Sequence, residues 1–373
     1  MATAVQSFLS RLLLVLNFIL AFLFLLAAVS PYLNPQRWWF ISWLGFVFPF
    51  LFFLLLVSVI FWGFLRPKYA IIFLVTLVLG WKSITAFFSF HLPSEYEPAR
   101  RDGTLRVVTW NVARFLELVK NNDAGSHVRL RMMDQLKSVN ADILCMQEFY
   151  TSDLPANYDN IDYIQKNLGY PYYYFYYDPD GYKQYFSSVI FSRFPLVDTG
   201  KVIFPQPSSP EALLHADIKW NGDTIRIFTT HLQSVQFKKK DYERIDEIRR
   251  YNDGLVDNSR TIFSKIRRGF TNRSIQADVI RGEVEKSPYP VVLCGDFNDI
   301  PNSYTYFRIR GKLSDAFLVK GSGVGRTFNS ISPTLRIDYI LFSRRLKAMQ
   351  FSRFPRNLSD HYMLLADFEV NRR

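Results

Sequence analysis

The sequence predicts an α/β domain that follows an N-terminal transmembrane helical region. Residues 1–90 contain five basic residues and no acidic residue, and they hold three apolar segments near the roughly 20 residues that a helix needs to cross a bilayer. Beyond about residue 95, apolar strand-like segments alternate with charged helical ones, as in a globular domain. These observations divide the chain into a transmembrane anchor over 1–92, a polar linker over 93–103 and a domain over 104–373.

The three apolar segments of the anchor are expected to form helices over about 12–30, 40–62 and 69–90. The first two contain no charged residue, whereas the third contains Lys82, whose ammonium group can reach the interface while its stem stays in lipid. With three crossings, the basic loop at Arg66 and Lys68 places the amino terminus inside and the domain outside the cytoplasm. Two crossings would leave the domain in the cytoplasm. We expect a multi-pass protein of the cell (inner) membrane with an extracytoplasmic domain.

In the domain, strands are expected where short apolar or β-branched runs end at a polar residue. These runs cover 105–110, 142–147, 188–191, 212–220, 224–230, 291–294 and 334–342. A helix is expected over 128–139, and Asn221-Gly222 is the signature of a tight hairpin turn between two of the strands. Asp338 stands in the middle of the last run, where a buried carboxylate requires a partner.

A strongly basic segment over 237–273 separates two of these strands. Ile262, Ile266 and Phe270 recur in it at helical spacing, which predicts an amphipathic helix. Its basic residues, which form the opposite face of that helix, include Arg267, Arg268 and Arg273. We favour a solvated helix packed on a sheet over a helix that contacts a membrane or nucleic acid. The formal net charge of +12 favours anionic partners of either kind.

Polar side chains of a particular kind stand at the ends of the predicted strands. They are Asn111, Glu148, His231, Asp296, Asn298, Asp338, Asp360 and His361. Carboxylate and amide oxygens suit Mg²⁺, an ion that keeps several waters and needs few protein ligands. Histidines and an asparagine can offset charge on a phosphoryl group in the transition state, and a buried aspartate can accept a proton from an attacking water. Zinc and serine-hydrolase chemistry fit less well, because the sequence lacks ligand-spaced cysteine or histidine pairs and a Gly-x-Ser-x-Gly motif at a strand end.

Six segments of the domain carry a resemblance to a known family. In chain order they are VVTWNVARF, ILCMQEF, TTHLQS, VVLCGDFND, RIDYILFS and LSDHYML. Together they resemble the motif set of the endonuclease/exonuclease/phosphatase superfamily, which has the fold of deoxyribonuclease I, and the resemblance covers about 104–370. It implies a two-sheet β-sandwich flanked by helices and an enzyme that cuts a phosphate ester with Mg²⁺ or Mn²⁺.

The resemblance also assigns three residues to the metal. Glu148 resembles the principal metal ligand, Asn111 stands beside it, and Asp360 resembles a residue of the same metal side. Many DNA-cutting members carry an acidic residue two positions after the first asparagine, and this chain has Ala113 there. That departure disfavours a nuclease but leaves it open.

The other five candidates resemble catalytic residues. Asp296 resembles the group that orients and deprotonates the attacking water, and Asn298 resembles one that holds a phosphoryl oxygen. His231 and His361 resemble the pair that polarises the phosphate. Asp338 resembles the carboxylate that orients His361.

We therefore expect a membrane-anchored, divalent-metal-dependent phosphoesterase that acts on a lipid headgroup or another small phosphate ester by in-line attack of an activated water. The anchor supports this choice, because it holds the domain within reach of lipid headgroups in the bilayer. A membrane-anchored endonuclease or exonuclease acting on nucleic acid is the alternative. A catalytically idle module that binds ligands in the same groove is the second alternative. The sequence leaves open the substrate, the choice between mono- and diester, the number of metal ions, the membrane orientation and the oligomeric state.

Overall fold

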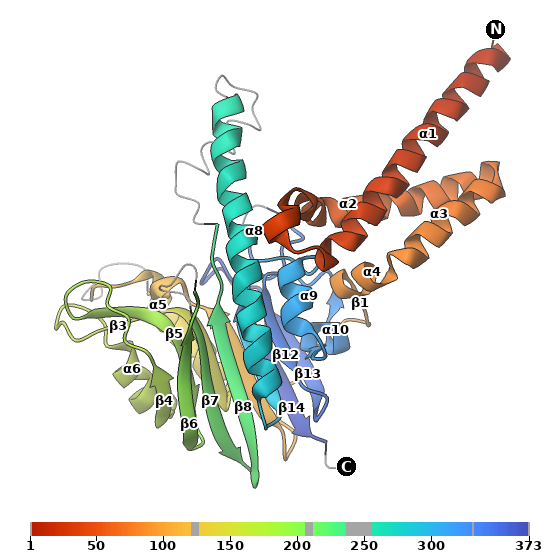
Figure 1. The fold of residues 1–373 in the computed structure, drawn as a ribbon. Coiled ribbons are helices and arrows are strands. Elements are labelled where there is room, and N and C mark those ends of the chain that lie inside the picture. Colours follow the sequence, from red (N-terminus) through yellow and green to blue (C-terminus); the bar gives the residue numbers. More distant parts are fainter. Residues whose placement is uncertain (1, 121–126, 206–211, 236–254, 330–331, 372–373) are drawn as a thin grey trace.

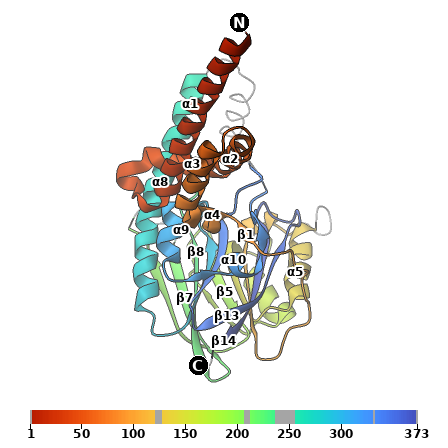
Figure 2. The same ribbon diagram turned by 90° about the vertical axis from the view of Figure 1, so that its right-hand side faces the viewer.

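The computed structural model describes residues 2–120, 127–205, 212–235, 255–329 and 332–371. Two six-stranded β-sheets pack against each other, helices lie on their outer faces, and an N-terminal helical region projects from one end (Figures 1 and 2). The predicted fold class, a two-sheet sandwich flanked by helices and preceded by apolar helices, is confirmed.

The first sheet has the strand order β13-β14-β2-β3-β5-β4. Its strands are β2 (Leu105–Asn111), β3 (Ile143–Ser152), β4 (Tyr172–Phe175), β5 (Gln184–Ser192), β13 (Leu346–Phe354) and β14 (Met363–Val370). Strands β2 and β3 are parallel and are joined through α5 (Val128–Val139), while α6 (Asn160–Tyr163) follows β3. Every residue of β2 is buried, including Arg106, whose guanidinium group forms an ion pair of 2.8 Å with Asp367.

The second sheet has the strand order β10-β12-β9-β8-β7-β6. Its strands are β6 (Leu196–Ile203), β7 (Ala212–Trp220), β8 (Asp223–His231), β9 (Val291–Asp296), β10 (Ser314–Asp315) and β12 (Asp338–Phe342). Strands β8 and β9 are parallel, and the long helix α8 (Leu255–Lys286) lies between them in the chain. Asn221 and Gly222 have φ values of 48° and 87°, as the predicted tight turn between β7 and β8 requires.

The predicted start of the last strand was wrong. It was expected over 334–342, but β12 begins at Asp338. Thr327 explains the difference, because its side-chain oxygen accepts hydrogen bonds from the backbone nitrogens of Ile337 and Asp338 at 2.9 and 3.1 Å. A side chain satisfies these amides where a strand would have done so, and Asp338 becomes the first residue of its strand instead of a central one.

An apolar core fills the space between the two sheets. Val107 contributes to it from the first sheet and Val292 from the second. Cys145 on β3 and Cys294 on β9 lie in the same core as free thiols. Burial, with a smaller contribution from Cys145, raises the pKa of the Cys294 thiol well above its ordinary value. The two cysteines therefore act as small apolar side chains in the core.

The helices that precede the domain are α1 (Ala2–Val29), α2 (Pro35–Leu65), α3 (Pro67–Leu79) and α4 (Trp81–Phe87). Helices α1 and α2 are long and apolar enough to cross a membrane. The third expected helix, over about 69–90, corresponds to two helices, α3 and α4, which meet at a bend of 63°. They make a third membrane span only if the bent pair is taken as a single span. Gly80 stands at the bend, and a Cβ there would lie 2.5 Å from the ring of Phe24. Glycine therefore allows α1 to approach the bend closely.

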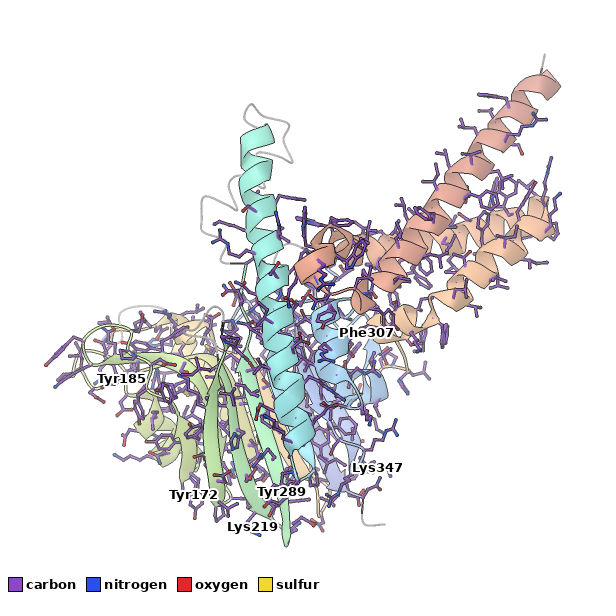
Figure 3. The ribbon with its side chains drawn as sticks, in the orientation of Figure 1. Tyr172, Tyr185, Lys219, Tyr289, Phe307 and Lys347 are labelled. Atoms are coloured by element: carbon purple, nitrogen blue, oxygen red, sulfur yellow. The ribbon has the colours of Figure 1, made fainter. Side chains whose placement is uncertain are left out.

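The helical region contacts the domain directly at the end from which it projects. The short elements at this junction are α9 (Tyr304–Arg310), α10 (Ala316–Lys320), and the paired strands β1 (Ser89–Phe90) and β11 (Ser322–Gly323). The Asn302 side-chain nitrogen donates a hydrogen bond of 2.8 Å to the carbonyl of Ala27 near the end of α1. Phe307 on α9, labelled in Figure 3, meets the ring of Tyr32 edge-on with 5.4 Å between centroids. Loops that follow β9 thus hold the helical region in place.

The amphipathic helix predicted in the basic segment forms part of α8, and its apolar face packs against α2. Phe263 stacks on Trp43 of α2 with 4.7 Å between ring centroids. Residues 236–254, with most of the basic start of the segment, lie outside the described residues. The placement of Arg273 on an exposed basic face was wrong, because its side chain is buried and forms an ion pair of 3.2 Å with Asp299.

Candidate active site

Strand topology places the predicted site residues at one end of the sandwich. Asn111, His231 and Asp296 are the last residues of β2, β8 and β9. His231 and Asp296 are register partners in the parallel pair of β8 and β9, and Asp338 is the partner of Asp296 in the antiparallel pair of β9 and β12. His361 stands just before β14, which begins beside the end of β2. The ends of these strands and the starts of their antiparallel neighbours therefore bring the polar side chains together.

Glu148 lies at a β-bulge inside β3. The predicted strand ended at Gln147, but β3 continues to Ser152, and its register with β5 shifts between Met146 and Phe149. Glu148 has a φ of 50°, whereas an ordinary strand residue has a negative φ. A bulge turns one side chain away from the regular alternation, and the Glu148 side chain is 31% exposed between buried neighbours. The bulge thus presents this carboxylate at the site.

Asn111 links Glu148 to Asp296 across the two sheets. Its side-chain nitrogen donates hydrogen bonds to Glu148 Oε1 at 3.0 Å and to Asp296 Oδ2 at 3.1 Å. Its side-chain oxygen accepts a hydrogen bond of 3.1 Å from the backbone nitrogen of Ala113. Two carboxylate oxygens therefore converge on one amide group.

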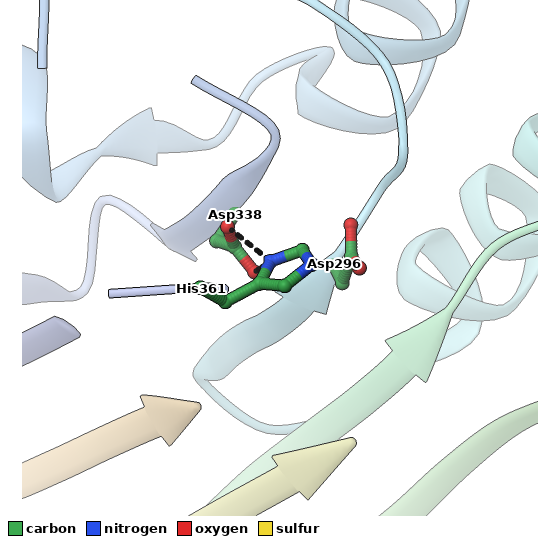
Figure 4. A group of neighbouring side chains, drawn as sticks. All are labelled: Asp296, Asp338 and His361. Atoms are coloured by element: carbon green, nitrogen blue, oxygen red, sulfur yellow. Dashed lines mark hydrogen bonds and ion pairs between the residues drawn. The ribbon is translucent and has the colours of Figure 1, made fainter. Parts of the chain in front are cut away.

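His361 lies between the carboxylates of Asp338 and Asp296 (Figure 4). Its Nδ1 is 3.0 Å from both oxygens of Asp338, and its Nε2 is 3.6 Å from Asp296 Oδ2. Burial alone would lower the pKa of His361, but the charges of Asp338 and Asp296 and the hydrogen bond to Asp338 together raise it to about 10. Burial raises the pKa of Asp338 to about 6 even though His361 opposes the shift. Between these values the pair is an imidazolium and a carboxylate.

His231 faces the same two acidic groups from β8. Its Nε2 lies 3.6 Å from Asp296 Oδ2 and 3.7 Å from Glu148 Oε1. This nitrogen is buried, and within the described part of the chain it has no hydrogen-bond partner. A buried polar atom without a partner is costly, so His231 is suited to bond a group that enters the site.

Asp296 and Asn298 form one short turn after β9. Asp296 Oδ1 accepts a hydrogen bond of 2.8 Å from the backbone nitrogen of Asn298, which leaves Oδ2 facing both histidines. Asn298 has a φ of 50°, and its side-chain nitrogen donates to the carbonyl of Leu232, the residue after His231. The turn therefore fixes Asp296 and holds the two loops of the site together.

Asp360 lies at the rim of the site rather than inside it. Its residue is exposed, and its Oδ1 is 3.2 Å from the hydroxyl of Ser359. Among the described residues, Asp296, Asp338 and His361 form a group of three whose ligand atoms all lie within 4.8 Å of one another. The structure thus brings Asn111 and Glu148 into contact with the histidine and aspartate group, with Asp360 near its edge.

The side chains present fit a divalent cation. Glu148 Oε1 and Asp296 Oδ2 lie 3.0 and 3.1 Å from the same side-chain nitrogen of Asn111, so the two carboxylates lie near each other, and carboxylate oxygens are ligands that hard cations prefer. Four acidic residues, Glu148, Asp296, Asp338 and Asp360, lie in or beside the site, and Arg273, which also lines the cavity, is already paired with a fifth, Asp299. This excess of negative charge favours a bound cation.

A cavity of about 570 Å³ opens from the site. Six of the predicted residues line one part of it, namely Glu148, His231, Asp296, Asn298, Asp360 and His361. Apolar side chains from α2, α4, α8 and the loops after β9 and before β12 line much of the rest. The site is therefore polar on one side and apolar on the other.

Sequence reasoning missed the residues that support the site from other segments. Ser359 donates a hydrogen bond of 2.9 Å to the carbonyl of Asn111 and accepts one of 3.2 Å from the backbone nitrogen of His361. It belongs to the LSDHYML segment, so its position beside Asp360 was the signal that could have found it. Thr327 and the walls from α2 and α8 carry no such signal, because only the fold brings them to the site.

Comparisons with known proteins agree with this architecture. The model of the Endonuclease/Exonuclease/phosphatase family matches residues 108–361, and the model of a domain of unknown function matches residues 10–87. The crystal structure of an endonuclease/exonuclease/phosphatase from Beutenbergia cavernae DSM 12333 is 19% identical with a TM-score of 0.51, over 73% of this chain and 72% of that one. At this identity the likeness shows the fold alone.

Two further solved structures are similar at a lower score. Humanized D. rerio TDP2 with 14 mutations is 17% identical with a TM-score of 0.49, over 72% of this chain and 100% of that one. The human Nocturnin catalytic domain with bound sulfate anion is 17% identical with a TM-score of 0.49, over 74% of this chain and 96% of that one. A comparison with curated proteins finds no match.

Proposed function

Because this chain belongs to the endonuclease/exonuclease/phosphatase family, we propose that it is a membrane-anchored, divalent-metal-dependent phosphoesterase. Its substrate is a lipid headgroup or another small phosphate ester, which is hydrolysed by in-line attack of an activated water. One observation carries the proposal. Asp296 Oδ2 is 3.6 Å from the Nε2 atoms of both His231 and His361, at the end of a cavity. A proton acceptor and two donors thus face the same space.

The residues of the metal side have a simple division of roles. Glu148, with Asn111 beside it and Asp360 at the rim, would hold Mg²⁺ or Mn²⁺, which when bound supplies Lewis-acid polarisation of the phosphoryl group. The hydrogen bonds of Asn111 keep Glu148 and Asp296 in fixed positions. Fixed ligands reduce the reorganisation that catalysis would otherwise require.

The remaining residues act on water and phosphate. Asp296 orients a water and takes its proton, the water oxygen bonds to phosphorus, and the ester P–O bond breaks as the leaving oxygen takes up a proton. His361, kept protonated by Asp338, and His231 donate hydrogen bonds to the phosphoryl oxygens, on which negative charge develops. Asn298 holds a phosphoryl oxygen from the turn after β9.

The choice of a lipid or small ester over nucleic acid rests on the helical region. Helices α1 and α2 could cross a membrane, and α2 itself lines the cavity that leads to the site. An enzyme held at a bilayer meets lipid headgroups at high effective concentration. We propose a location in the cell membrane, with the domain outside the cytoplasm if α3 and α4 together make a third span.

A membrane-anchored nuclease remains the second candidate. Arg267 and Arg268 on α8 are exposed, and the chain carries a formal net charge of +12, which would suit a nucleic acid backbone. An idle binding module is less favoured, since ligand binding alone does not need both a proton-accepting aspartate and an oriented histidine.

The test compares substrates on the full-length protein in detergent, with and without Mg²⁺. We expect metal-dependent release of phosphate or headgroup from phospholipids and soluble phosphate esters, and no comparable nicking of plasmid DNA. The Glu148→Gln variant keeps the shape of the side chain but removes its charge, so it should lose most metal-dependent activity while staying folded. Efficient DNA nicking without ester hydrolysis would favour the nuclease, and normal turnover by Glu148→Gln at saturating Mg²⁺ would overturn the metal assignment.

A further inference from the structure

We propose that the part of the cavity between α2 and α8 holds the hydrocarbon chain of a membrane lipid whose phosphate lies at the catalytic residues. This inference rests on the proposed function and narrows its substrate class to an amphipathic phosphate ester that enters from the bilayer. We call this part the apolar chamber. Its walls are Trp43, Phe46 and Val47 of α2, Ile262 and Ile266 of α8, and Ile300 of the domain.

The apolar chamber is continuous with the catalytic residues, because the same cavity is lined by both. Ile300 follows Asn298 by two positions, and Val235 follows His231 by four, so two loops of the site pass directly into the chamber wall. A phosphate bound between the histidines therefore has its ester substituent next to apolar side chains. The polar and apolar parts of the cavity match the two parts of a lipid.

The chamber offers little to a polar substituent. A sugar or base placed against Trp43, Phe46 and Ile266 would lose its water without gaining hydrogen bonds, which costs free energy. Arg273 also lines the cavity, but its guanidinium group is paired with Asp299 and donates to the carbonyl of Gln233. A hydrocarbon chain gains on entering such a site, because each methylene leaves water.

The opening of the chamber lies on the apolar helix. Val47 lines the chamber and is 42% exposed, so the chamber reaches the surface at this point of α2. Directly beyond it, α2 carries a series of exposed large apolar residues that includes Phe50, Phe53, Leu54 and Val57. Since α2 is long and apolar enough to cross a membrane, a chain in the bilayer could pass along α2 into the chamber at Val47.

Close packing holds α2 at this position. A Cβ on Gly45 would lie 2.7 Å from the carbonyl oxygen of Asn302, so α2 touches the loop that follows the catalytic turn. On the other wall, the rings of Trp43 and Phe263 stack with centroids 4.7 Å apart, which fixes α8 against α2. In Figures 1 and 2, one end of α8 lies beside the helical region and its other end lies along the sandwich. The chamber is thus built by packed elements.

The first experiment measures kcat/KM of the full-length protein for a homologous series of esters. Alkyl phosphates test for monoesterase activity and alkyl p-nitrophenyl phosphates for diesterase activity. Within each series only the alkyl chain changes, from methyl to decyl. We expect kcat/KM to rise roughly two- to fourfold per methylene until the chamber is filled. Hydrolysis of the methyl ester alone, with no rise along the series, would overturn the chamber while leaving the proposed function in place. No hydrolysis of any ester, with Mg²⁺ present, would overturn both.

Matched variants separate the chamber from partitioning of long chains into detergent. Ile266→Trp fills the chamber and should lower the decyl-to-methyl ratio of kcat/KM at least tenfold. Val57→Trp changes an exposed apolar residue of α2 outside the chamber and should leave that ratio unchanged. The same ratio in Ile266→Trp, Val57→Trp and the unaltered protein would mean that partitioning alone produced the chain-length dependence, and would overturn the proposal.

A binding experiment decides the matter even if Ile266→Trp does not fold. A decylphosphonate with a diazirine at the end of its chain is bound to the unaltered full-length protein, irradiated and mapped by peptide mass spectrometry. We expect crosslinks at 43–47 of α2 and 262–266 of α8, suppressed by excess decylphosphonate but not by methylphosphonate. Crosslinks confined to the exposed part of α2 at 50–65 would overturn the proposal.

Discussion

Replacement of Arg273 by methionine is expected to destabilise the protein strongly. The side chains of Arg273 and Asp299 are 1% and 2% exposed, and Arg273 Nε is 3.2 Å from Asp299 Oδ2. Arg273 also donates a hydrogen bond of 3.0 Å to the carbonyl of Gln233. Methionine keeps the apolar stem but leaves the buried carboxylate without its cation, so the change tests the pair itself.

Loss of one partner from a buried ion pair costs about 3–5 kcal/mol. For a domain of this size about 1 kcal/mol corresponds to roughly 2 °C, so the unfolding midpoint of Arg273→Met should fall by roughly 6–10 °C. Arg267 provides the control on the same helix, because it is exposed and its guanidinium lies over the Trp39 ring at 4.6 Å. Such exposed contacts contribute about 0.5–1 kcal/mol, and Arg267→Met should shift the midpoint by no more than about 2 °C.

The assay is thermal unfolding of the purified full-length proteins in one detergent, followed by tryptophan fluorescence. The double variant Arg273→Met/Asp299→Leu removes both charges, and replacement of a buried pair by apolar residues is often nearly neutral. It should therefore recover most of the lost stability. Equal unfolding midpoints for Arg273→Met and Arg267→Met would refute the reasoning. They would mean that Arg273 lies on the exposed basic face of α8, as Arg267 does.

The remaining predictions concern catalysis, topology and the membrane surface. Asp296→Asn and His231→Ala should each lower kcat by at least ~10²-fold on a soluble ester, the scale of a general base or a transition-state donor, whereas a change in KM alone would mean that these residues only bind. A reporter enzyme that works only outside the cytoplasm should be active when fused after Arg373, and activity of a cytoplasmic reporter at the same place would reverse the orientation. Neutralising Arg267 and Arg268 should weaken turnover in anionic vesicles, as added salt should, but spare a soluble ester; equal loss on both substrates would mean that the helix is structural.

Local patterns predicted much of the sandwich, because buried strands and tight turns leave local signals in the chain. The all-buried β9 begins with the continuous apolar run of residues 291–294, and Asn221-Gly222 forms the turn that its residue types demand. Positions near special backbone geometry were harder. Glu148 was expected after a strand end and lies at a bulge within β3, and Asp338 was expected inside a strand and begins one. In both cases a partner distant in sequence sets the geometry, β5 for Glu148 and Thr327 for Asp338.

The walls of the cavity could not be predicted for a similar reason. The spacing of Ile262 and Ile266 shows that α8 has an apolar face, but a periodic pattern does not say what the face will cover. The structure places α2 there, a helix more than 200 residues earlier in the chain. The apolar composition of α2 indicates a membrane span equally well along its whole length, although its first half contacts α8 and the domain and its second half buries Leu55 and Trp62 against the other N-terminal helices.

The contacts between the helical region and the domain lie close in sequence to Asp296 and Asp338, the two carboxylates proposed to act in catalysis, which gives the helical region a second expected role. Asn302, six residues after Asp296, donates to the carbonyl of Ala27, and Arg336, two residues before Asp338, donates to the carbonyl of Ala86 at 2.6 Å. Both donors are buried, so each would lose a partner without replacement if the helices moved away. The loops that position Asp296 and Asp338 therefore depend on the helical region for part of their hydrogen bonding. The helical region is therefore a supporting part of the site and, through α2, one wall of its cavity, in addition to its proposed role as a membrane anchor.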